Sequence, residues 1–398
     1  MKLKYKILLF LTSFSLGLIL PVQSLLLMAH GCTLQTLGLA LGAYAVAVIA
    51  AEVPTGVFAD LYGRKAAFLT AILLSAASGV VLLVSSSFPA AMAALMLMGL
   101  GVAFASGSAD ALIIEKVQAQ TKSKSLHQTV STLRILEAAG LMVGAICGGF
   151  LPKTSGYSLH IGLRLALTAI VFLLALFVLS EPKKTTQHAP SVKSHLIAMR
   201  QILQTKNGIK TILFCIAAFG FMQFMLETYW QPQLTDLADA GAQALLGVLS
   251  AASFGMTAVG SFVVSRIQSK KTAVYWAGYL LLALIMSAFV ILLSCQTTPG
   301  GFAVVYLAIY LALGMVTVFE QTLIHSKISD SVRASMLSLT SFTARGGGVI
   351  SSLVGASLIV RIDIASLWRI GAYIAIFCFA LSAVFHRYSK HQHALQQQ

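Results

Sequence analysis

The chain has 398 residues, of which 58% are hydrophobic and only 10% are charged, and its formal net charge is +15 at pH 7. A soluble globular chain is about 25% charged, so this composition excludes a water-soluble domain built on one core. The bilayer leaves no water for unpaired backbone groups, so spanning segments must be helices or a closed barrel. The apolar runs are longer than barrel strands and do not alternate. We therefore predict an all-α membrane protein.

Twelve apolar runs, separated by charged or Pro- and Gly-rich breaks, approach the roughly 20 residues that a membrane-spanning helix needs. We expect two pseudo-symmetric six-helix halves, 1–180 and 211–398, joined by a linker, 181–210, that contains a surface amphipathic helix. In chain order the runs are 6–28, 33–56, 66–85, 90–114, 126–151, 163–179, 211–230, 244–265, 274–294, 302–324, 336–360 and 367–385.

Most of the 27 Lys and Arg residues fall in alternate breaks, on one face of the predicted membrane protein. By the positive-inside rule, both termini and the linker are cytoplasmic, and we expect a multi-pass protein of a prokaryotic cytoplasmic membrane. This distribution explains the charge without a nucleic-acid partner. The few basic residues expected toward the outer face are Lys153, Arg164, Arg361 and Arg369.

The break between the second and third runs is dense in glycine and charge. It resembles the loop between helices 2 and 3 of major facilitator superfamily transporters, with Leu61 where the family usually has Arg or Lys. The resemblance implies a twelve-helix secondary transporter whose halves alternate around a midplane site. It also implies a gating loop in which Asp60 lies near the start of helix 11, beside Asp330 or Ser331; simple anchoring by positive charge is the alternative. The predicted gating residues are Gly56, Asp60, Gly63, Arg64 and Lys65.

The fifth run carries glycines at four-residue spacing, which lie on one helix face and allow close helix approach. The pattern resembles the antiporter signature of the superfamily's exporters, with Ala145 in place of the usual Pro. The resemblance implies packing against helix 8, where Gly247 and Gly255 would permit it; ordinary small-residue packing is the alternative. The glycines concerned are Gly140, Gly144, Gly148 and Gly149.

Charged residues inside spans are functional candidates, because each costs at least about 2.5 kcal/mol at mid-depth. Arg134 and Glu137 are close enough on one helix face to pair. Glu137 is the candidate proton carrier, and a permanent structural ion pair is the alternative. The resemblance implies that helices 1, 4, 7 and 10 line the cavity. The candidate cavity residues are Gln23, Glu227, Glu320 and, near the centre of helix 11, Arg345.

The sequence predicts a transporter rather than an enzyme. It lacks a Gly-x-x-x-x-Gly-Lys-Ser/Thr phosphate loop, and its five cysteines show no paired spacing, so we expect no cofactor, metal or disulfide. We expect a monomer acting on a small-molecule substrate with protons as the coupling ion. The first hypothesis is proton-coupled efflux of a small amphipathic or cationic compound. The alternatives are a permease for an anionic metabolite bound by Arg134 and Arg345, and a non-transporting receptor on the same fold.

Overall fold

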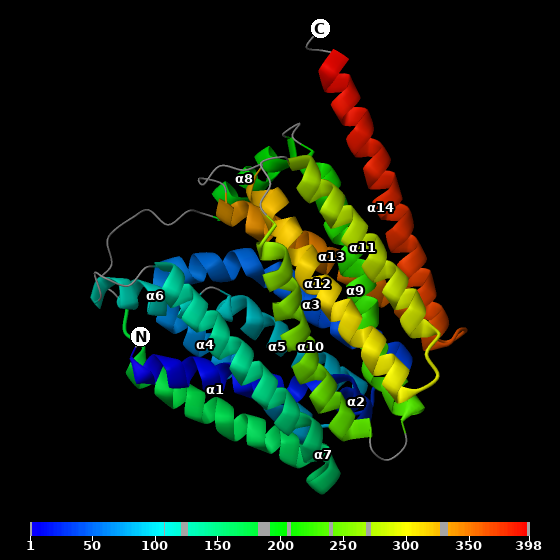
Figure 1. The fold of residues 1–398 in the computed structure, drawn as a ribbon. Helices are drawn as coiled ribbons and strands as arrows, with labels where there is room; N and C mark the ends of the chain where they lie inside the picture. Colours follow the sequence, from blue (N-terminus) through cyan, green and yellow to red (C-terminus); the bar gives the residue numbers. More distant parts are fainter. Residues whose placement is uncertain are drawn as a thin grey trace. The chain divides into compact units, whose positions relative to one another are not determined.

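A computed structural model of the chain describes residues 2–106, 108–120, 126–181, 192–204, 208–238, 242–267, 272–326 and 333–395, and every regular element within these ranges is helical (Figure 1). Contacts group the chain into two compact units. Unit 1 comprises Met1–Val192 and Asp239–Phe254, and unit 2 comprises Lys193–Ala238 and Gly255–Gln398. The units differ from the predicted halves mainly because residues 239–254 group with unit 1.

The first span of unit 1 is broken. Helix α1 (Leu3–Ile19) is followed by a 3-10 turn, η1 (Leu20–Val22), and by the short helix α2 (Gln23–Ala29). Pro21 lies in this turn, where the missing N–H of proline removes one helical hydrogen bond. The break places Gln23 at the first position of α2.

The predicted gating loop is almost entirely helical, which corrects the expectation of a loop after residue 56. Helix α3 (Leu34–Tyr62) continues through Gly56 and Asp60, and α4 (Arg64–Val84) begins directly after Gly63. Gly63 has a backbone φ of 101°, a value that residues with a Cβ atom rarely adopt. The turn between the two spans is therefore made by this glycine.

The remaining spans of unit 1 are α5 (Phe88–Ala105), extended by α6 (Ser108–Gln120), and α7 (Leu126–Val178). The long α7 comprises two helices that meet at Gly156, whose φ of 68° is not helical. The second of these begins at Gly156, before the predicted start at 163. Arg164, expected at the outer end of its span, therefore lies about two turns inside the span and is buried. The prediction failed because polar side chains here are buried within the protein instead of marking a loop.

Unit 2 follows the linker. Its first helix, α8, lies where an amphipathic helix was predicted: Met199 and Ile202 are buried, whereas Arg200 is exposed. From the linker onward, the helices are α8 (Val192–Gln204), α9 (Ile209–Leu237), α10 (Ala242–Ser265), α11 (Thr272–Ser294), α12 (Pro299–His325), α13 (Arg333–Leu358) and α14 (Ile364–Leu395). By contacts, Val192 of α8 and residues 242–254 of α10 group with unit 1, and the rest of these helices group with unit 2.

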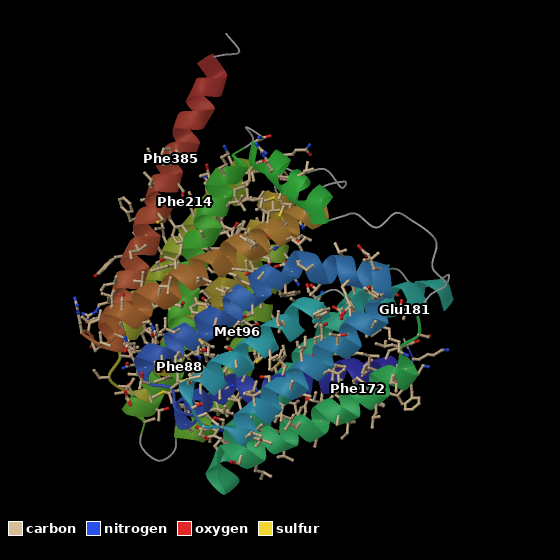
Figure 2. All side chains as sticks on the ribbon, turned by 180° about the vertical axis from the view of Figure 1, so that it is seen from behind. Phe88, Met96, Phe172, Glu181, Phe214 and Phe385 are labelled. Carbon is tan, nitrogen blue, oxygen red and sulfur yellow. The ribbon has the colours of Figure 1, made fainter. Side chains whose placement is uncertain are left out.

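Eleven segments of the described chain are long and apolar enough to cross a membrane. The twelfth predicted span corresponds to α13, whose 26 residues extend about 39 Å at 1.5 Å per residue. This length exceeds the roughly 30 Å of a hydrocarbon core, although the serines, threonines and Arg345 of α13 lower its hydropathy. Exposed apolar side chains such as Met96, Phe214 and Phe385 suit contact with lipid (Figure 2).

The two units repeat the same helix pairings. In unit 1, α1 packs mainly on α7, α4 on α5, and α4 on α7; in unit 2, α9 packs on α13, α11 on α12, and α11 on α14. The first pairing uses glycine in both units: Gly140 of α7 faces the Phe10 carbonyl of α1, and Gly347 of α13 faces the Ala217 carbonyl of α9. This correspondence is the structural trace of a six-helix repeat.

Candidate functional site

The residues predicted to form a gating loop have an unpredicted partner, Glu181, just after the end of α7 (Figure 2). The backbone N–H of Lys65 donates to the Glu181 carboxylate, and Lys65 Nζ donates to the Leu176 carbonyl oxygen at 2.6 Å. A Cβ on Gly63 would lie 2.6 Å from Glu181 Oε1, the end of a flexible side chain, and the φ of 101° is the stronger reason for glycine at this position. The carboxylate sits at the N-terminus of α4, where the helix dipole favours negative charge.

The remaining motif residues differ in their surroundings. Asp60 is exposed, and the predicted contact of Asp60 with Asp330 or Ser331 lies outside the described residues. A Cβ at Gly56 would meet no atom within 4 Å, so nothing near it requires glycine. No local sequence pattern pointed to Glu181, because it is far from Lys65 in the chain.

The antiporter-like glycines pack differently from the implied arrangement. The nearest atoms to Gly140, Gly144 and Gly148 are backbone atoms of α1, whereas Ala145 and Gly149 approach Gly247 of α10. The implied contact with the eighth span is therefore made in the second half of the motif. The physical reason is that the glycines four residues apart share the face turned to α1, while Gly149 lies on the adjacent face.

Arg134 and Glu137 form the ion pair that their spacing predicts. Arg134 Nη1 lies 2.7 Å from Glu137 Oε2, and Arg134 Nη2 lies 3.6 Å from Asp110 Oδ2 of α6. The Arg134 side chain is 68% exposed. Because Arg134 already contacts two carboxylates, it does not suit the predicted role of binding an anionic substrate.

Glu227 is the centre of a polar and aromatic cluster in unit 2. Gln223 Nε2, one turn earlier on α9, donates to Glu227 Oε1 at 2.9 Å, and the Tyr310 hydroxyl of α12 donates to the same oxygen. Tyr306 donates to the Tyr310 hydroxyl at 3.2 Å, and its ring centroid lies 4.8 Å from that of Trp230. We call these five residues the Glu227 cluster.

The Glu227 cluster contains polar groups that can accept further hydrogen bonds from a ligand. Among the described residues, no basic side chain forms an ion pair with Glu227. The Gln223 Oε1 atom is buried without a hydrogen-bond partner in the described part of the chain. A carboxylate and an amide oxygen beside aromatic rings form the set of groups that recognises an organic cation or an N–H donor.

The other predicted cavity residues lie apart from this cluster along their helices. Glu320 is on α12, about 15 Å beyond Tyr310 at 1.5 Å per residue. Arg345 of α13 donates to the Ser341 hydroxyl one turn earlier. Gln23 is half-buried at the start of α2 in unit 1.

Known proteins share both the sequence pattern and the fold. The profile of the Major Facilitator Superfamily matches residues 7–352. A protein named "Uncharacterized MFS-type transporter YxaM", from Bacillus subtilis (strain 168), is 24% identical over 236 residues, and this match covers 57% of each chain.

Among solved structures, that of the nucleoside transporter NupG is similar with a TM-score of 0.77 at 16% identity, covering 96% of this chain and 98% of NupG. The human organic anion transporter MFSD10 (TETRAN) gives a TM-score of 0.64 at 15% identity, with 95% and 98% covered. Sequence identities this low establish that the folds are alike, and they do not assign a substrate to this chain. Together with the profile match and the repeated six-helix units, they lead to one conclusion: the chain belongs to the Major Facilitator Superfamily and is a membrane transporter, not an enzyme.

Proposed function

We propose that the protein exports a small amphipathic or cationic compound in exchange for protons across a prokaryotic cytoplasmic membrane, with both termini in the cytoplasm. The two units would alternate access to a midplane site, as in other secondary transporters built from repeats. The observation that carries the proposal is the Glu227 carboxylate, which lies in a membrane span without a basic partner among the described residues.

A carboxylate in a membrane span without a basic partner is costly, so it favours a bound proton or a bound cation. The two ligands exclude each other on one carboxylate, which is the requirement for exchange transport. Tyr310 and Gln223 fix the orientation of Glu227 by hydrogen bonds, and the rings of Tyr306 and Trp230 supply cation–π and apolar contact. Glu137 stays a second candidate for proton coupling, paired with Arg134.

The test is accumulation of ethidium, a fluorescent organic cation, in everted membrane vesicles with an imposed proton gradient. We expect accumulation to require the gradient and to fall at least tenfold in Glu227→Gln. The matched control is Asp236→Asn, which removes an exposed carboxylate from the same helix α9 and should leave accumulation unchanged.

Several outcomes would contradict the proposal. Accumulation without a gradient, or full activity of Glu227→Gln, would remove Glu227 from the exchange mechanism. Loss of accumulation in Glu137→Gln alone would assign proton coupling to Glu137. Competition by a nucleoside or an organic anion, the substrates named for NupG and MFSD10, would point to a different substrate class.

A further inference from the structure

Arg164 is a buried cation in the interior of unit 1. It lies about 12 Å along the helix axis from Gly156, at 1.5 Å per residue, inside the span Gly156–Val178. Only 6% of its surface is exposed. A charged group at such a depth is rare unless a partner of opposite charge or a function retains it.

Few groups of the described chain compensate the positive charge of Arg164. Its Nη2 donates to Ser75 Oγ of α4 at 3.1 Å, whereas its Nε is buried without a hydrogen-bond partner among the described residues. The ion pairs found in the described ranges involve Arg134 and not Arg164. An unpaired charge that is buried costs much more free energy than a buried hydroxyl, so this site favours an anionic ligand.

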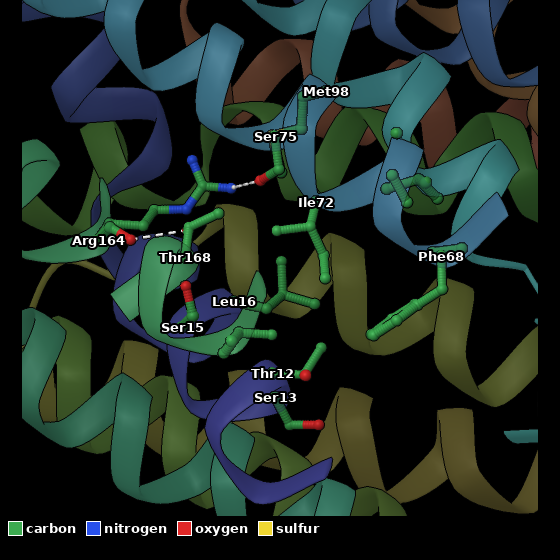
Figure 3. Close-up of a pocket in the computed structure, with 15 residues that line it drawn as sticks. Thr12, Ser13, Ser15, Leu16, Phe68, Ile72, Ser75, Met98, Arg164 and Thr168 are labelled. Atoms are coloured by element: carbon green, nitrogen blue, oxygen red, sulfur yellow. Dashed lines mark hydrogen bonds between the residues drawn. The ribbon is translucent and has the colours of Figure 1, made fainter. Parts of the chain in front are cut away.

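Arg164 borders a cavity of about 170 Å³ among α1, α4, α5 and the second helix of α7 (Figure 3). Hydroxyl groups from three helices line it: Ser13 and Ser15 of α1, Ser75 of α4 and Thr168 of α7. Phe68, Ile72 and Met98 make much of the remaining wall apolar. Figure 3 shows Arg164 and Ser75 joined by their hydrogen bond at one side of this space.

The chemistry of the lining limits the ligand. Ser75 Oγ accepts from Arg164, so its own hydroxyl hydrogen can donate to an anion held beside the guanidinium. Thr168 Oγ1 already donates to the Arg164 carbonyl oxygen at 2.7 Å, which fixes its position. The volume exceeds that of one water but is below the roughly 300 Å³ at which pockets for drug-sized ligands begin.

We propose that this cavity binds a small monovalent anion, a halide or a short carboxylate, beside the Arg164 guanidinium, where the Ser75 hydroxyl also donates to it. The site would be a second ligand site, within unit 1, and it does not depend on the transport reaction assigned to Glu227. Its ligand would neutralise the buried charge of Arg164, for which the described residues supply no acidic partner.

The test measures thermal unfolding of the purified full-length protein in detergent, followed by tryptophan fluorescence. Sodium chloride or sodium acetate replaces sodium gluconate, a bulkier anion, at constant total sodium. Because a ligand that binds the native state stabilises it by mass action, we expect a saturable rise of several degrees in the unfolding midpoint. Saturation by chloride alone would indicate a halide site, and saturation by acetate a carboxylate site.

Variants separate this site from general salt effects. Arg164→Gln should abolish the saturable rise, and Ser75→Ala should raise the half-saturating concentration severalfold. Arg361→Gln, which removes an exposed positive charge, should behave as the unmodified protein does. No saturable rise with either anion, or an unchanged rise in Arg164→Gln, would overturn the proposal. If Arg164→Gln fails to fold, an unchanged half-saturating concentration in Ser75→Ala would overturn it equally.

Discussion

Unit 1 and unit 2 share their helix pairings but bury opposite charges. In unit 1 the carboxylates of Asp110 and Glu137 contact Arg134, and the buried Arg164 has no carboxylate partner among the described residues. In unit 2 the Glu227 carboxylate accepts hydrogen bonds from Tyr310 and Gln223 and has no basic partner in the described ranges. The two units therefore share their helix-packing contacts, whereas their charged groups differ.

The largest expected effect tests the shared backbone packing. Gly144→Leu in unit 1 and Gly347→Leu in unit 2 each place a side chain against a backbone carbonyl of the neighbouring helix, where neither backbone can yield easily. We expect each substitution to destabilise the protein by about 3 kcal/mol or more, as overpacking does in its severe cases. The measurement is the yield of monodisperse protein in detergent by size-exclusion chromatography.

Gly56→Leu provides the control for this pair, because a Cβ there meets no atom within 4 Å. Its yield should match that of the unmodified protein. A severe loss in only one of the two buried variants would break the comparison, since the units would then not share the same close packing.

The next effect concerns the charge chemistry of unit 2. Tyr310→Phe removes the hydroxyl that donates to Glu227 but keeps the ring beside Tyr306. A hydrogen bond to a charged group contributes about 1.5 to 3 kcal/mol, so we expect an apparent affinity for the exported cation that is weaker by about tenfold or more. The measurement is the half-saturating ethidium concentration in everted vesicles.

Tyr275→Phe is the matched control, because Tyr275 lies on α11 against Phe319 and outside the Glu227 cluster. An equal loss of affinity in both variants would show that the effect of Tyr310→Phe is not local to Glu227.

A smaller effect is expected at the start of α4, where Glu181 lies at the helix N-terminus. Negative charge at this position stabilises a helix by about 0.3 to 1 kcal/mol. Glu181→Ala should therefore lower the unfolding midpoint slightly, and added salt should reduce the difference because the residue is exposed. A difference that persists unchanged in high salt would argue against the dipole explanation.

Sequence reasoning located the spans well, because the apolar period and length follow directly from the bilayer. It predicted the Arg134–Glu137 pair, since residues three apart on a helix are neighbours. It missed the Glu181 contact and the Tyr310 contact with Glu227, because each joins residues that are distant in the chain. It also missed the burial of Arg164, because that burial depends on tertiary packing. Gly63 marks the turn itself, where φ is 101°, and did not identify Glu181.

The last prediction compares two ways of placing a carboxylate at a helix start, each expected to contribute no more than about 1 kcal/mol. Unit 1 uses the distant Glu181 at α4, whereas unit 2 uses the adjacent Asp363 at α14, whose Oδ1 accepts from the Ser366 N–H at 3.0 Å. The hydrogen bonds from the Ser366 side chain and backbone lower the pKa of Asp363 below its usual value. Asp363→Ala should cost about 0.5 to 1 kcal/mol at pH 7, as loss of an N-cap does.

The sign of the pH dependence follows from the lowered pKa of Asp363. Its stabilisation is complete above the pKa of the unfolded chain and is lost as pH falls through the lower folded-state pKa. The unfolding midpoints of the unmodified protein and Asp363→Ala should therefore converge in acid, from about pH 4 downward. Asp363→Asn keeps an N-cap acceptor without a titrating charge, so it should retain part of the stability at all pH values. Convergence that begins near neutral pH would assign the effect to another group.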